Sequence, residues 1–404
     1  MAASLAAGLP VFLAAGPERS LTLEIRDYAE LPITGKLDGT GQSDGMLARM
    51  NSLREEPGGA KRFFINDING PLYILDKATQ NLTTYLDFNG REGHTGLFHK
   101  FVFETGWANG LLSNGRYRIP SDNPFMSTEG ARKEVWAYGF RNPHRLHFAI
   151  DPGDPRNNRL VADSVGLHTW ETVNIVHKGA NYGYSAREGN STLKADNQIV
   201  RQLPEIDTVP VLVTDTITNG TITPTYPVIQ YGHVPGGGDA IGAGFLYNGR
   251  IVPALRGKYI FTDITTGRIW YADYKEMLAA DDGNPSTMAE RHEIKIRWDN
   301  PHDTPDAGPK VYDTMFPIAE AAYHCRGGTD PDLPGVSLVS GRGRADAQLG
   351  VDAAGELYIL TKTDGALRAV VGGTARYAED ADSRRVVALF PGNSAARRDR
   401  KTHV

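Results

Sequence analysis

A hairpin-like phrase recurs along the chain and constrains its fold more than any other feature. In each copy, a run of alternating apolar residues leads into a polar turn with Asp, Asn or Gly, and a second β-rich run follows. The copies occupy residues 61–76, 144–164, 258–273 and 349–371. Repeated hairpins separated by irregular loops are typical of the blades of a β-propeller. Because the copies are unevenly spaced, unrelated hairpins of a β-sandwich are the alternative interpretation.

Composition favours an all-β protein and excludes several kinds of partner. The 404 residues include 45 Gly and 24 Pro, which suit many short strands joined by tight turns. A net charge of -5, with basic and acidic residues mixed along the chain, provides no surface for nucleic acid. The sequence contains no apolar run of about 18 residues, so no membrane span is expected. The lone Cys325 excludes an intramolecular disulfide.

The segments outside the hairpins are predicted to be mostly irregular. Tyr274–Ala280 is the best candidate for a short helix, whereas residues 190–226 and 281–314 lack periodicity and are interpreted as long surface loops. The N-terminus contains a short apolar run that ends in Ala-Ala-Gly, which is typical of a secretory signal. An ordinary apolar N-terminus, or a signal that starts upstream of Met1, is the alternative.

These features predict the domain organisation. We expect a signal-like segment at residues 1–20, a single β-propeller domain at 21–373 and a polar, flexible tail at 374–404. A signal-like start predicts a periplasmic or extracellular protein. Oligomeric state is not indicated by any pattern in the sequence.

Several motifs in a fixed order carry a family resemblance. They include YRIPSDNPF at 117–125, EVWAYGFRNPHRL at 134–146, HTWETVNIV and GANYGY within 168–184, and GGDAIGAGFLYNG at 237–249. With these motifs the chain resembles the glucose/sorbosone dehydrogenase family. The resemblance implies a six-bladed β-propeller that uses pyrroloquinoline quinone, usually with calcium, to oxidise an aldose at its anomeric carbon. It also implies a small-molecule sugar and an electron acceptor as partners.

The resemblance further implies where the quinone binds. Arg141 and Asn142 match the family's Arg-Asn pair at the propeller mouth, and Arg342 and Arg344 precede the last hairpin, where the family carries cofactor-binding arginines. The quinone has three carboxylates, and arginine binds planar anions through two parallel hydrogen bonds. A turn with Arg141 in a surface salt bridge is the alternative.

His147 follows the Arg-Asn pair in the next strand, and packing in the core or on the surface is the better interpretation of this residue.

One stretch departs from the family pattern. The family places its catalytic histidine after a Gly-Leu-rich turn and follows it with a calcium loop and another blade. Here the corresponding stretch leads through residues 112–116 straight into the 117–125 motif, so we expect blades and the calcium loop to be missing there. The catalytic base is therefore unknown, although His94 and His99 are the nearest histidines, and no metal site is expected. Asn248 stands where some sugar-oxidising relatives carry a lysine.

Two other functions stay open from the sequence, and catalytic competence is undecided. A propeller that lacks its catalytic base would serve as a non-catalytic binding or interaction module. A propeller lactonase would need several metal-ligating carboxylates, and the sequence shows no such cluster. Quinone-dependent aldose oxidation is the leading hypothesis.

Overall fold

The computed structural model describes residues 20–35, 45–59, 61–87, 119–212, 217–304, 306–335 and 343–376. Residues Leu21–Thr374 make up one compact unit, and the expected domain limits stay a prediction. Several predictions fall outside the described residues: the signal-like segment, the C-terminal tail, His94, His99, the shortening at residues 112–116, and Arg342.

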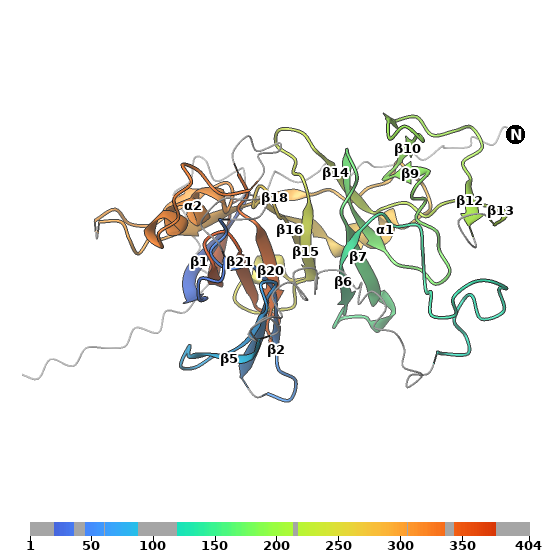
Figure 1. Cartoon of the computed structure of the whole chain (residues 1–404). Coiled ribbons are helices and arrows are strands. Elements are labelled where there is room, and N and C mark those ends of the chain that lie inside the picture. The colour runs from blue at the N-terminus through green and yellow to red at the C-terminus, as the bar shows by residue number, and fades with distance from the viewer. Residues whose placement is uncertain are drawn as a thin grey trace, which may run out of the picture. The chain divides into compact units, whose positions relative to one another are not determined.

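Four groups of four neighbouring strands form the main architecture, and we call them the first to fourth blade (Figure 1). The second blade is a separate four-stranded sheet, whereas the first, third and fourth are joined by strand pairing into one 13-stranded sheet. The first blade contains β2 (Met50–Glu55), β3 (Arg62–Asp67), β4 (Pro71–Asp76) and β5 (Leu82–Asp87). The second contains β6 (Pro143–Ala149), β7 (Arg159–Ser164), β8 (Trp170–Ile175) and β14 (Ile229–Gly232). The third contains β15 (Ile241–Leu246), β16 (Lys258–Asp263), β17 (Ile269–Asp273) and β18 (His292–Trp298). The fourth contains β20 (Ala347–Val351), β21 (Leu357–Thr361), β22 (Ala366–Arg376) and, as its outer strand, β1 (Ser20–Glu30).

Shorter elements extend the blades. Between β8 and β14 lie a small sheet of β9 (Arg187–Glu188), β10 (Ser191–Leu193) and β11 (Ile199–Val200), and a hairpin of β12 (Val209–Leu212) and β13 (Thr218–Ile222). Strand β19 (Lys310–Tyr312) pairs with β18, and the α-helices of the described residues are α1 (Tyr274–Ala280) and α2 (Phe316–Cys325). Within the described residues, neither helix is long and apolar enough to cross a membrane.

The innermost strands β2, β6, β15 and β20 run parallel to one another. Strands β2 and β20 pair in parallel register. Near the starts of β6 and β20, the Nε2 atoms of His144 and Gln348 are 3.4 Å apart. Further along, the rings of His147 in β6 and Phe245 in β15 meet edge to face, with their centroids 5.0 Å apart. Parallel inner strands around one axis are the arrangement of a β-propeller, so the predicted fold class is confirmed. The described residues hold four blades, whereas the family resemblance implies six.

Apolar side chains fill the space between neighbouring blades. Val173, Phe261 and Trp270 belong to the buried cluster between the second and third blades. Phe63 of the first blade and Tyr358 of the fourth meet edge to face, with ring centroids 4.9 Å apart. Full burial of such a side chain stabilises the fold by roughly 1.5–3 kcal/mol. These contacts hold the inner strands, and the loops that precede them, in fixed positions.

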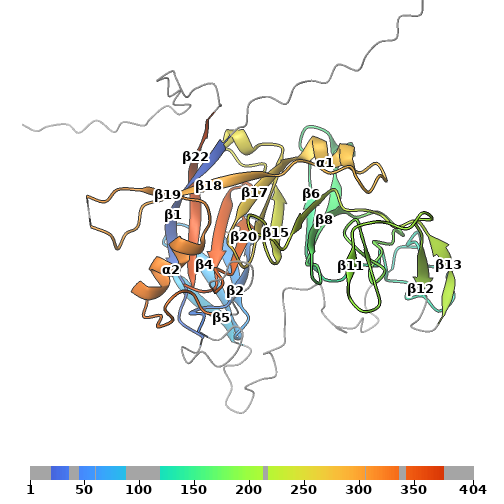
Figure 2. The ribbon, with the colours of Figure 1, turned by 90° about the horizontal axis from the view of Figure 1, so that it is seen from above.

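Strand β1 joins two blades at their outer edges. It lies between β18 of the third blade and β22 of the fourth, and it pairs with β18 in parallel register (Figure 2). The buried Arg368 of β22 fastens it: Nε lies 2.8 Å from Asp27 Oδ1 of β1, and Nη2 lies 2.8 Å from Asp364 Oδ2. The N-terminal strand is therefore part of the sheet system.

The predicted hairpins are all present, and α1 spans the residues predicted for a helix. The interpretation of residues 190–226 and 281–314 as loops was wrong where β10–β13, β18 and β19 form. In β18, Ile294, Ile296 and Trp298 are buried while Lys295 and Arg297 between them are exposed. The alternation is regular, but three of the seven residues of the strand are charged, so its apolar content is low for its length.

Candidate functional site

The candidate site lies where the inner strands begin, and we call this end of the propeller the entrance. Arg141 and Asn142 directly precede β6, and Arg344 lies shortly before β20. Strands β6 and β20 are in contact near their starts through His144 and Gln348. The structure therefore brings the predicted Arg-Asn pair and Arg344 to the same end of the propeller.

Arg141 is exposed and lines a small pocket together with Trp170, Tyr184 and Glu188. The free space in this pocket is about 30 Å³, which is enough for one or two water molecules and too little for a sugar or a quinone. The backbone beside it is fixed, because the carbonyl of Asn142 accepts a hydrogen bond from the N–H of Val165 at 2.8 Å. Arg141 can therefore contact a ligand only on the open side of the entrance.

A second cation, which the sequence analysis missed, lies beside Arg344. Lys362 stands in the turn between β21 and β22 and is buried. Its Nζ is 3.8 Å from Asp346 Oδ1, and Arg344 Nη2 is 3.3 Å from the same oxygen. Two cations thus converge on one buried carboxylate. A lysine inside the polar turn of the last hairpin, between two apolar strands, was the available signal.

Arg49 adds a further cation from the segment that precedes β2. Its neighbour Ala48 donates its N–H to the carbonyl of Lys362 at 3.2 Å, which places this segment beside Lys362. The Nε atom of Arg49 is buried and has no hydrogen-bond partner in the described part of the chain. A buried donor without a partner costs about 1–3 kcal/mol, so this N–H suits an acceptor on a ligand. We call Arg49, Arg141, Arg344 and Lys362 the entrance cations.

Buried amides line the axis just inside the entrance. Asn51 Oδ1 accepts a hydrogen bond from Arg145 at 2.9 Å. The Nδ2 of Asn51 and the Oε1 of Gln348 are buried, and neither has a hydrogen-bond partner among the described residues. His144, also buried, faces Gln348. One available donor and one available acceptor match the requirements of a hydroxyl group or a water molecule.

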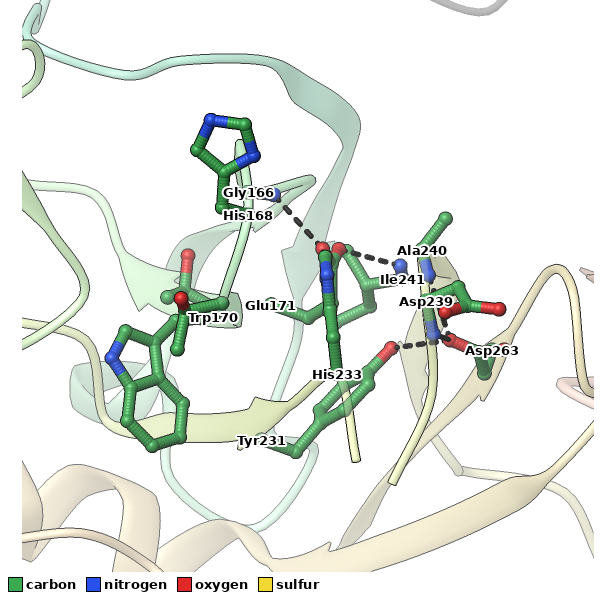
Figure 3. A network of polar contacts seen from close by, with 12 residues as sticks. Gly166, His168, Trp170, Glu171, Tyr231, His233, Asp239, Ala240, Ile241 and Asp263 are labelled. Carbon is green, nitrogen blue, oxygen red and sulfur yellow. Dashed lines mark hydrogen bonds and ion pairs between the residues drawn. The ribbon is translucent and has the colours of Figure 1, made fainter. Parts of the chain in front are cut away.

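A buried glutamate ties the second blade to the third (Figure 3). Glu171 accepts hydrogen bonds from the N–H groups of Ile241 at 2.7 Å and Gly166 at 3.0 Å, and its Oε1 lies 2.7 Å from His233 Nε2. Burial raises the pKa of Glu171. Burial alone would lower the pKa of His233, but the hydrogen bond to Glu171 and its charge raise that pKa above the usual value. The pair therefore holds a proton more tightly than an isolated imidazole would.

Asp263, at the end of β16, organises the loop that precedes β15 (Figure 3). Its Oδ2 accepts hydrogen bonds from the N–H groups of Asp239 at 2.8 Å and Ala240 at 2.9 Å and from the Tyr231 hydroxyl at 3.1 Å. Its Oδ1 accepts from the N–H and the hydroxyl of Thr266, both at 2.8 Å. With five donors on one buried carboxylate, Asp263 positions backbone and is not available to a substrate.

The described residues also show the surroundings of the other positions that the sequence singled out: metal-ligating side chains, Asn248 and His147. The described residues contain no group of three or more His, Cys, Asp or Glu side chains that could hold a metal ion. Asn248 follows β15 at the end opposite the entrance, where its Nδ2 donates to the carbonyl of Ile150 at 2.9 Å. A lysine at this position would not reach the entrance, so its absence removes no entrance cation. His147 is packed against Phe245, in line with the packing interpretation.

Comparison with known proteins bears on the motifs around this site. The family model described as glucose/sorbosone dehydrogenase matches residues 106–297. The predicted family resemblance is confirmed. The match includes the Arg-Asn pair, Glu171 and the first three strands of the third blade, so the entrance of the second and third blades is glucose/sorbosone dehydrogenase-like.

Relatives are similar over short stretches. The HIPL1 protein of Arabidopsis thaliana is 29% identical over 160 residues, which are 39% of this chain and 20% of that protein. The aldose sugar dehydrogenase YliI of Escherichia coli is 41% identical over 66 residues, 16% of each chain. The crystal structure of the soluble aldose sugar dehydrogenase from Escherichia coli has 13% identity and a TM-score of 0.45, with 88% of this chain and 100% of that chain covered. The chain thus aligns with a fifth or less of the length of these two curated relatives.

The entrance residues can be tested against the quinone that the family uses. Arg49, Arg344 and Lys362 provide cationic groups for carboxylates, and the buried Nε of Arg49 lacks a partner within the described residues. The donor chemistry therefore fits a polycarboxylate. The water-sized pocket beside Arg141 does not provide the volume for it, so the fit rests on Arg49, Arg344 and Lys362.

Proposed function

We propose that this protein binds a quinone of the pyrroloquinoline type at the entrance and oxidises aldose sugars at the anomeric carbon. The observation that carries the proposal is the approach of Arg344 and Lys362 to the buried carboxylate of Asp346, at the end of the propeller where the segments that carry Arg49 and Arg141 enter β2 and β6. When bound, the quinone would accept a hydride from the sugar. The match to the glucose/sorbosone dehydrogenase family supports this chemistry.

The chain's own residues would bind and orient the two partners. Arg49, Arg344 and Lys362 would bind the carboxylates, since charge-assisted hydrogen bonds to such groups are about twice as strong as neutral ones. Arg141 and Asn142 would contact the quinone carbonyls, as the resemblance implies. Asn51 and Gln348, whose buried polar atoms match a hydroxyl group, would position a hydroxyl at the axis. The group that takes the hydroxyl proton is left unassigned, and an exported location remains part of the proposal.

Reconstitution tests the function directly. The purified chain is incubated with the quinone and calcium, and aldoses are offered with a dye acceptor. We expect aldose-dependent dye reduction, and we expect Arg141→Gln to reduce it at least tenfold while Lys295→Gln, an exposed outer-strand variant, leaves it unchanged. Absence of dye reduction together with absence of quinone binding would overturn the proposal.

A non-catalytic interaction module is the second candidate. Strand β6 presents Leu146 and Phe148 to solvent with exposed fractions of 50% and 67%, and exposed apolar surface of this kind marks interaction sites when it is contiguous. This function predicts a protein partner whose binding survives Arg141→Ala and is lost with Phe148→Ser. The opposite pattern, with binding lost only in Arg141→Ala, would argue against it.

A further inference from the structure

A second, larger pocket lies at the end of the propeller opposite the entrance. It is formed where β6 and β15 end, by Asp151 and Asn248, and where β16 begins and β17 ends, by Arg256 and Lys275. Its volume is about 360 Å³, which is within the range of small-molecule sites. It shares no lining residue with the pocket beside Arg141.

Three cationic side chains line this pocket: Arg250, Arg256 and Lys275. All three are exposed. Arg256 uses its Nε to donate to the carbonyl of Gly249 at 2.9 Å, and its Nη1 and Nη2 make no hydrogen bond within the described residues. The Arg250 side chain makes no hydrogen bond in the described structure.

The carboxylates nearby are engaged with other groups. Asp151 is the acidic residue of the lining, and it accepts hydrogen bonds from Gly153 N–H at 2.8 Å and Asn157 Nδ2 at 2.9 Å. Glu356 accepts from the N–H groups of Arg250 at 2.6 Å and Ile251 at 3.2 Å. Asp273 forms an ion pair with Lys258, and its Oδ1 accepts a hydrogen bond from the N–H of Lys275 at 2.8 Å. The lining therefore carries three cations against a single carboxylate.

We propose that this pocket binds a phosphate group, either as free phosphate or on a phosphorylated sugar. Guanidinium groups bind phosphate oxygens through two parallel hydrogen bonds, and an ammonium adds a third cationic contact. The buried ring of Tyr274, whose hydroxyl donates to the carbonyl of Asn157 at 2.6 Å, provides an apolar wall for the part of a ligand that carries no charge. The site is independent of the proposed quinone function.

Calorimetric titration of the full chain without quinone tests this proposal. The probes are inorganic phosphate, glucose 6-phosphate and glucose, and the proteins are wild type, the double variant Arg250→Gln with Arg256→Gln, and the control Arg297→Gln, an exposed arginine on β18. We expect wild type and control to bind the two phosphate compounds and not glucose. We expect the double variant to bind at least tenfold more weakly, with an unchanged thermal midpoint in the absence of phosphate.

The relative affinities for the two phosphate compounds show whether the ligand is free phosphate or a phosphorylated sugar. Tighter binding of glucose 6-phosphate than of phosphate identifies a phosphorylated sugar as the ligand, and equal binding identifies free phosphate. Absence of binding to either compound, or equal affinity in wild type and the double variant, overturns the site. Neither result depends on quinone binding at the entrance, so the failure of one proposal is distinguishable from the failure of the other.

Discussion

His147 illustrates how a single residue on the axis responds to its surroundings. Its ring lies in β6 against Phe245, and burial, together with the nearby charge of Arg54, lowers its pKa to about 4. Near neutral pH the ring is mostly neutral in both the folded and the unfolded state, so protonation of His147 hardly changes the free energy of unfolding there. Between about pH 6.5 and pH 4, the unfolded histidine binds a proton, because its pKa is near 6.5, whereas the folded ring does not.

We therefore predict a stability loss in acid that depends on His147. As the pH falls from about 6.5 to about 4, the folded state should lose up to roughly 3 kcal/mol through this group, with no further change below. The variant His147→Leu should lack this component when unfolding by urea is measured between pH 4 and 7.

The difference between variant and wild type isolates this group. Asp163, whose pKa burial raises to about 7, has the opposite slope, because its stability contribution falls as pH rises from about 4 to 7. That slope is common to both proteins and cancels in the difference. The exposed Leu146→Ala, which removes no titratable group, serves as the control and should give a flat difference. A flat difference for His147→Leu as well would show that the ring is not buried as described.

At the scale of single elements, turns are organised by buried carboxylates at strand ends. Asp263 binds both the β16–β17 turn through Thr266 and the loop before β15 through Asp239 and Ala240. Asp364 binds the N–H of Ala366 at 2.9 Å in the corresponding turn of the fourth blade. The aspartate of the repeated hairpin phrase is thus a structural residue of the blade.

Asp263→Ala should destabilise the protein strongly. The substitution leaves buried donors without partners, and we expect a loss of about 3–5 kcal/mol in the free energy of unfolding. The exposed Asp306→Ala should change it by less than about 0.5 kcal/mol. Urea denaturation of both variants measures the difference, and a loss below about 1 kcal/mol for Asp263→Ala would contradict the role assigned to this carboxylate.

The hairpins of the blades could be predicted from sequence because each is local: alternation and a turn signal lie within one segment. Strand β18 was missed because its solvent face is fully charged and one of the strands with which it pairs, β1, is remote in sequence. Arg141 and Arg344 could be placed by resemblance to the family. Lys362 and Arg49 could not be placed together from the sequence, because their segments meet through the Ala48–Lys362 backbone hydrogen bond between the first and fourth blades.

At the scale of the whole molecule, the N-terminal strand holds the outer edges of two blades together. Its attachment depends on Arg368, which is fully buried between Asp27 and Asp364 and lies over the ring of Trp298 at 5.6 Å. Removal of one partner of a buried ion pair leaves an uncompensated charge. Loss of the Arg368 ion pairs should therefore detach β1 from the sheet and lower the free energy of unfolding.

Arg368→Met should lower the free energy of unfolding by about 3–5 kcal/mol and expose β1 to protease. Limited proteolysis with identification of the first cleavage site measures the second effect. Asp27→Asn, which changes the partly exposed partner, should give a smaller effect of the same kind. Equal protease resistance of wild type and Arg368→Met would contradict the attachment of β1 through Arg368.

Titration of the quinone into the full chain, followed by intrinsic tryptophan fluorescence, shows whether the entrance cations bind a quinone of the pyrroloquinoline type. We expect saturable binding with one quinone per chain, at least tenfold weaker in Arg49→Gln and in Arg344→Gln and unchanged in Lys295→Gln, with all variants folded by circular dichroism. Absence of saturable binding, or equal affinity in all four proteins, would contradict quinone binding by the entrance cations.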